Sequence, residues 1–111
     1  MDAHFNPVQD AAALEQLFEL SNMRPVLLFK HSNACPISAR AYRQMEQFGG
    51  DVAIVVVQKS REVSREVETR TGVRHETPQA LVLRNGEAVW SASHFDITSD
   101  AVESALKDAE G

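Results

Sequence analysis

The chain has 111 residues and a formal net charge of −5 at pH 7. This length predicts a single domain, residues 1–111, whose core needs neither a disulfide nor a structural metal. The acidic balance argues against a nucleic-acid surface, which needs a basic face, and against electrostatic attachment to anionic lipid. No stretch approaches the roughly 20 apolar residues of a membrane span. We therefore expect neither nucleic acid nor a membrane as a partner.

Cys35 is the only cysteine in the chain, so an internal disulfide is excluded. An unpaired thiol fits a reducing compartment better than an oxidising one. The start of the chain, MDAHFNPVQDAAALEQ, lacks the basic segment followed by an apolar run that marks a secretion signal. These features predict a cytoplasmic protein.

The first two thirds of the chain alternate between helical and strand patterns. Apolar residues three and four apart indicate helices, and continuous apolar runs of strand length indicate strands buried on both faces. Pro36 stands in the first turn of one helix, where proline is best tolerated. We expect helices over 9–21, 35–50 and 60–72, and strands over 25–31 and 51–58.

The last third has a different pattern. Residues 77–92 contain two apolar runs joined by Asn85–Gly86, a strong hairpin signal. Residues 96–111 predict a helix that Thr98 or Ser99 can cap. The order of elements predicts an α/β protein of the thioredoxin-like class. Its central mixed sheet is expected to have four strands, with helices on both faces and an extra N-terminal helix.

Cys35 follows a predicted buried strand and directly precedes Pro36 and a helix. Free backbone N–H groups and the positive end of the helix dipole stabilise an anion at that position, and the thiolate is the nucleophilic form of cysteine. Ser38 stands where a dithiol oxidoreductase has its second cysteine. Its hydroxyl can donate a hydrogen bond to the thiolate, but it cannot form a disulfide. Cys35 is therefore predicted to take over one half of a mixed disulfide, which an external thiol must release.

An inert, buried cysteine is the opposing interpretation, and the strand-Cys-Pro-helix context weighs against it. Thr77–Pro78 comes just before the third strand, where thioredoxin-like folds have a cis-proline against the catalytic sulfur, so we favour a cis bond here. His31 either tunes the sulfur or only ends its strand, and the sequence leaves both open. One cysteine and scattered histidines do not meet the spacing of a metal site, so none is expected.

The sequence allows two interpretations for three basic side chains and one for two aromatic side chains. Lys30, Arg40 and Arg43 either add positive potential at the site or form a solvated surface. Trp90 and Phe95 are expected to serve in packing rather than recognition.

Two long stretches resemble the monothiol bacilliredoxins of the YtxJ/BrxC type. The first is FKHSNACPISARA, which contains the Cys-Pro-Ile-Ser motif of that family. The second is VRHETPQALVLRNGEAVWSASHFDIT, with its Thr-Pro-Gln, Asn-Gly and Trp…Ala-Ser-His elements. Together the likeness covers roughly Leu14 to Leu106. The family usually has threonine before the motif's cysteine, where this chain has Ala34.

The resemblance implies a thioredoxin-like fold and the removal of bacillithiol from protein mixed disulfides under oxidative stress. Cys35 would be the attacking cysteine, Ser38 would occupy the resolving position and Pro78 would be the cis-proline. We assign substrate contacts to Pro36, Ile37, Thr77 and His31. No bound cofactor is expected, because bacillithiol acts as a co-substrate. The expected partners are S-bacillithiolated proteins, bacillithiol and a downstream redoxin or reductase.

Two alternatives remain open. A monothiol glutaredoxin that carries an iron–sulfur cluster also has Cys-x-x-Ser, but it places glycine where this chain has Pro36. A thioredoxin-like binding module without catalysis would use a groove near Pro78 and would not depend on Cys35.

Overall fold

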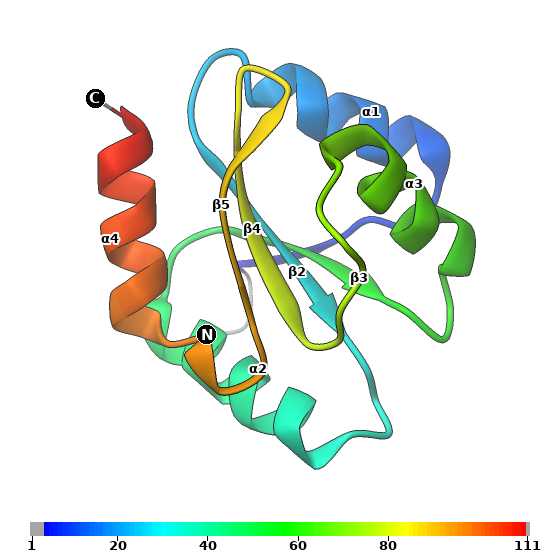
Figure 1. Ribbon diagram of the computed structural model, residues 1–111, viewed down its shortest axis with the longest axis vertical. Helices are drawn as coiled ribbons and strands as arrows, with labels where there is room; N and C mark the ends of the chain where they lie inside the picture. Colours follow the sequence, from blue (N-terminus) through cyan, green and yellow to red (C-terminus); the bar gives the residue numbers. More distant parts are fainter. Residues whose placement is uncertain (1–3, 111) are drawn as a thin grey trace.

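The computed structural model describes residues 4–110. A mixed five-stranded sheet has the order β1-β3-β2-β4-β5, and helices cover both of its faces (Figure 1). β1, β3 and β2 run parallel to one another, while β4 is antiparallel to both β2 and β5. The elements in chain order are β1 Phe5–Pro7, α1 Ala11–Leu20, β2 Val26–His31, α2 Pro36–Phe48, β3 Val52–Val56, α3 Arg61–Thr71, β4 Gln79–Arg84, β5 Glu87–Ser93, η1 His94–Asp96 and α4 Ser99–Glu110.

The prediction of a four-stranded sheet is wrong, because β1 is a fifth strand at the edge of the sheet. β1 pairs in parallel with β3, with Phe5 opposite Val52. Its three residues, Phe5–Pro7, are too few to show an alternating pattern, and proline within a run argues against a strand. The N-terminal helix α1 is present and follows this strand.

Each face of the sheet contributes to its own apolar core. Successive residues of β2 point to opposite faces, as strand geometry requires. Leu28 joins the core under α1 and α3, whereas Leu27 and Phe29 join the core under α2 and α4. Leu27, Leu28 and Phe29 are all buried. Burial on both faces explains why polar and apolar residues do not alternate in the predicted strand over 25–31.

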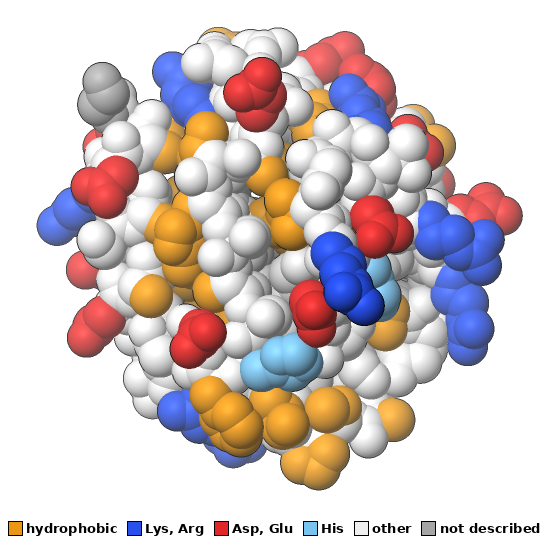
Figure 2. Space-filling model, in the orientation of Figure 1, with side chains coloured by type: hydrophobic (Ala, Val, Ile, Leu, Met, Phe, Trp, Pro, Cys, Tyr) orange, Lys and Arg blue, Asp and Glu red, His pale blue; other side chains and the backbone are white. Residues whose placement is uncertain are grey.

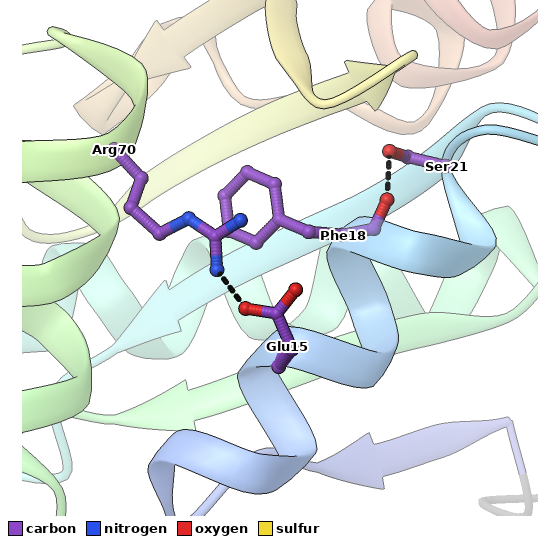
Figure 3. Close-up of polar contacts among 4 residues, drawn as sticks. All are labelled: Glu15, Phe18, Ser21 and Arg70. Carbon is purple, nitrogen blue, oxygen red and sulfur yellow. Dashed lines mark hydrogen bonds and ion pairs between the residues drawn. The ribbon is translucent and has the colours of Figure 1, made fainter.

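A polar contact on the surface joins α1 to α3 (Figure 3). Arg70 of α3 lies 2.6 Å from Glu15 and places its guanidinium 4.0 Å from the centre of the Phe18 ring. Phe18 belongs to the core beneath α1 and α3. Ser21 ends α1 by donating its hydroxyl to the Phe18 carbonyl and accepts a hydrogen bond from the Gly86 N–H. These contacts fix the two helices and the β4–β5 turn at the end of the sheet that lies away from Cys35.

The predicted hairpin and the predicted cap of the last helix are both confirmed. Asn85 and Gly86 have φ values of 55° and 79°, the left-handed conformation that a two-residue hairpin turn requires. Thr98 caps α4, because its Oγ1 accepts the Ala101 N–H at 3.1 Å. No helix within residues 4–110 combines the length and the apolar character needed to cross a membrane.

Candidate active site around Cys35

Cys35 is the N-cap residue of α2, as the sequence predicts, and it is half-buried. Its backbone is extended, with φ −118° and ψ 122°, and Pro36 occupies the first turn. An N-cap side chain normally accepts hydrogen bonds from the N–H groups of the second and third helical residues. Here those residues are Ile37 and Ser38, whose N–H groups have no partner inside the helix. The Cys35 side chain itself makes no capping hydrogen bond within residues 4–110, and the positive end of the helix dipole lies beside it.

Ser38 is fully buried and holds the loop that leads to Cys35. Its hydroxyl oxygen accepts the Ser32 N–H at 2.9 Å and lies 2.8 Å from Nδ1 of His31. Among residues 4–110 these are the hydrogen-bond partners of this hydroxyl, and no bond joins it to the sulfur. Ser38 therefore acts on the loop before Cys35 rather than on the thiol itself.

His31 both ends β2 and contacts the residue in the resolving position. Its ring lies 5.1 Å from the Tyr42 ring and 5.6 Å from the Phe29 ring, measured between centroids. Burial lowers the pKa of His31 below its usual value, and hydrogen bonding to Ser38 partly opposes this. The imidazole is therefore neutral near pH 7. His31 links α2 to β2 through Ser38. Its effect on the Cys35 sulfur stays a prediction.

The Thr77–Pro78 peptide bond is cis, as predicted. Lys30 of β2 pairs with Gln79 of β4, so Pro78 lies at the same end of the sheet as His31 and the loop to Cys35. Pro78 is buried, and its carbonyl accepts the His94 N–H at 3.1 Å. The structure thus brings the two predicted segments, Cys35–Ser38 and Thr77–Pro78, to one end of the molecule.

Apolar side chains surround this end. Figure 2 shows hydrophobic side chains gathered over the first turns of α2. Pro36 is exposed and Ile37 is half-buried, while 59% of Phe95 is exposed. The expected packing role of Phe95 is therefore wrong, since its ring lies at the surface with the Arg40 guanidinium 5.3 Å away. Trp90, by contrast, packs against the core beneath α2 and α4.

The sequence matches the monothiol bacilliredoxin BrxC family over residues 6–102. The chain belongs to this family.

Solved structures show that this family member has the thioredoxin fold. One described as an oxidoreductase with a thioredoxin fold is 34% identical, with a TM-score of 0.85, and the match covers 93% of this chain and 94% of that one. Thioredoxin from Fasciola hepatica is 15% identical, with a TM-score of 0.73 over 94% of this chain and 98% of its own. Spinach chloroplast thioredoxin f is 14% identical, with a TM-score of 0.74 over 97% and 95%. The chain is thus a thioredoxin-fold bacilliredoxin with thiol oxidoreductase-like function.

In this bacilliredoxin, the buried Lys30 and the exposed His75 form a polar cluster next to the cis-proline loop, which the sequence did not reveal. Lys30 is fully buried, and its Nζ lies 3.1 Å from Nδ1 of His75. Because an ammonium group can only donate, Nδ1 is the acceptor and Nε2 carries the ring proton. Nε2 lies 3.2 Å from Oγ1 of Thr77 and so donates to it. A chain of hydrogen bonds thus runs from Lys30 through His75 to the residue before Pro78.

The pKa values of both basic groups in this cluster are lowered. Burial lowers the pKa of Lys30 to about 8, although the Glu68 carboxylate opposes the change. The pKa of His75 falls below its usual value through burial first and the Lys30 charge second. Lysine is rarely fully buried, but its place within the continuous run VLLFKH was a signal that β2 is buried throughout. The partner His75 lies 45 residues away and leaves no sequence signal.

Within residues 4–110, no three His, Cys, Asp or Glu side chains lie close enough together to hold a metal ion.

Proposed function

We propose that this bacilliredoxin removes bacillithiol from protein mixed disulfides through Cys35. The observation that carries the proposal is a half-buried sulfur at the N-cap of α2, in a chain that has no second cysteine. Cys35 attacks as the thiolate, because the thiolate is the nucleophilic form of cysteine. Membership of the monothiol bacilliredoxin family supports bacillithiol as the small thiol.

The exchange takes place in two balanced steps. The Cys35 thiolate attacks the bacillithiol sulfur, the bond between that sulfur and the target protein breaks, and the target cysteine leaves as a thiolate. Cys35 then carries bacillithiol in a new disulfide. The thiolate of a second bacillithiol, or of a partner redoxin, attacks the bacillithiol sulfur of this adduct and releases Cys35. With bacillithiol as the second thiol, the other product is its disulfide, which a downstream reductase must reduce.

Other residues act by position. We assign contacts with the mixed disulfide to Pro36, Ile37 and Thr77, the residue before the buried Pro78. Ser38 together with His31 holds the loop before Cys35. A single thiol in this role fits a reducing compartment, so we place the reaction in the cytoplasm.

The test is to incubate the reduced protein with an S-bacillithiolated protein and to weigh both partners. The expected result is one bacillithiol gained on Cys35 and one lost from the target, with no transfer to the Cys35→Ser variant. Ser104→Ala, a change on the exposed surface of α4, is the matched control and should transfer like the unchanged protein. A target that keeps its bacillithiol, or one that loses it equally in the presence of Cys35→Ser, would contradict the proposal.

A further inference from the structure

An open pocket of about 450 Å³ lies along one face of α3. Its lining includes Gln58, Arg61, Ser64, Arg65, Glu68 and His75. Four of these residues lie on α3 at steps of three and four, so they share one face of the helix. The volume falls in the range of pockets that hold small molecules.

The lining of the pocket includes two arginines that make no ion pair within residues 4–110. Among residues 4–110, neither Arg61 nor Arg65 makes an ion pair or a hydrogen bond, in contrast to Arg70, which is paired with Glu15. The one carboxylate in the lining, on Glu68, accepts the backbone N–H of His75 at 2.9 Å. Arg61 and Arg65, one turn apart, outnumber the single carboxylate among the residues that line the pocket.

Ser64 and His75 form an uncharged part of the pocket wall, and the buried Lys30 contacts His75. Ser64 is 5% exposed, and its hydroxyl lies 3.3 Å from Nδ1 of His75. The same nitrogen accepts from the fully buried Lys30 at 3.1 Å. A third basic group therefore adjoins the pocket from the interior.

Hydrogen bonds connect the pocket to both loops beside Cys35. The side chain of Gln58 accepts the Asn33 N–H at 3.2 Å and donates to Oγ of Ser32 at 2.7 Å. On the other side, His75 donates to Thr77, the residue before Pro78. Two residues of the pocket wall, Gln58 and His75, thus contact the loop that leads to Cys35 and the residue before Pro78.

We propose that this pocket binds a carboxylate of the small thiol that Cys35 takes from its substrate, with Arg61 and Arg65 as the ion-pairing groups. The inference rests on the proposed function, because it requires Cys35 to form a disulfide with a small thiol. It adds that the enzyme selects anionic small thiols over neutral ones of similar size. Arginine suits this role, since its planar donors match a carboxylate in two-point contact.

The test uses one peptide that carries either mercaptosuccinate, which has two carboxylates, or 2-mercaptoethanol, which has none. The rate constant for adduct formation at Cys35 is measured for both by quenched mass spectrometry, and their ratio is compared between variants. The ratio removes differences in intrinsic reactivity, because these are the same for every variant. The Arg61→Gln/Arg65→Gln variant should lower the mercaptosuccinate preference about five- to tenfold, as expected for the loss of two partly solvated charge pairs. Arg24→Gln, at the opposite end of β2, is the matched control and should keep the ratio.

Binding is read separately in Cys35→Ser protein, which cannot react. Titration with succinate should shift the amide resonances of Gln58, Ser64 and His75, and the double arginine variant should abolish these shifts. Shifts confined to the neighbouring pocket of about 420 Å³, which Tyr42, Arg43 and Lys59 help to line, would overturn the inference, as would an unchanged rate ratio. Failure of the unchanged protein to react with either peptide would overturn the proposed function instead, and the titration would still decide what the pocket binds.

Discussion

Replacing the buried Lys30 with methionine should stabilise the protein at neutral pH and lose this advantage in alkali. Lys30 is 0% exposed, and burial lowers its pKa from 10.5 to about 8. The protonated lysine therefore opposes folding, since transfer of an ammonium group out of water is costly even with His75 as an acceptor. Methionine has similar length and no charge, so it removes this cost while filling the same space.

The pKa values determine both the sign and the size of the effect. Between pH 8 and 10.5 the unfolded chain keeps a proton on Lys30 that the folded protein has lost, so the stability of the unchanged protein rises with pH across that window. At 1.36 kcal/mol for each pKa unit, the full change amounts to about 3 kcal/mol. The stability difference between Lys30→Met and the unchanged protein should fall by about this amount from pH 7 to pH 10.5.

Urea denaturation followed by far-ultraviolet circular dichroism at pH 7, 8, 9 and 10 measures this difference. Contributions from other titrating groups cancel, because both proteins contain them. Lys107→Met, a change of the same type on the exposed surface of α4, should show no such dependence. A difference between Lys30→Met and the unchanged protein that is constant from pH 7 to pH 10 would refute the argument from burial.

Three further substitutions test other parts of the structure. Ser38→Ala should lower the free energy of unfolding by about 1–3 kcal/mol, because the Ser32 N–H loses its acceptor; urea denaturation measures it, and an unchanged midpoint would show that water replaces the hydroxyl. Arg70→Met should cost about 1 kcal/mol through loss of the Glu15 pair and the contact with the Phe18 ring. Arg74→Met is its control, and equal losses in the two would remove the case for the α1–α3 contact. Met45→Ala, at a fully buried position in the core beneath α2 and α4, should cost about 2–5 kcal/mol; a loss below 1 kcal/mol in thermal unfolding would mean that the core collapses around the cavity.

The single cysteine has a kinetic consequence for the proposed exchange. A dithiol oxidoreductase can expel a bound small thiol with its own second sulfur, whereas Ser38 cannot. The adduct on Cys35 therefore persists until another thiol arrives. Contacts between the protein and the bound small thiol then affect how long this adduct lasts. This makes the arginines of α3 relevant to the resolving step as well as to the first attack.

Local chemistry in the sequence was enough to place the candidate nucleophile. Pro36 begins a helix because its missing N–H costs nothing in the first turn, and the apolar run before it forms a strand, so Cys35 had to lie at their junction. Asn85–Gly86 predicted the β4–β5 turn because these residues tolerate positive φ. Each of these features depends on neighbours within a few residues.

Contacts between distant segments were decided by the tertiary structure alone. β1 becomes a strand only because β3 offers it a partner across the sheet. Ser38 hydrogen-bonds His31, rather than the sulfur three residues before it, because α2 packs over the end of β2. The burial of Lys30, its bond to His75 and the pocket along α3 depend on how the helices close over the sheet. Side-chain pairing across such distances is set by register and packing, for which a single sequence carries no periodic signal.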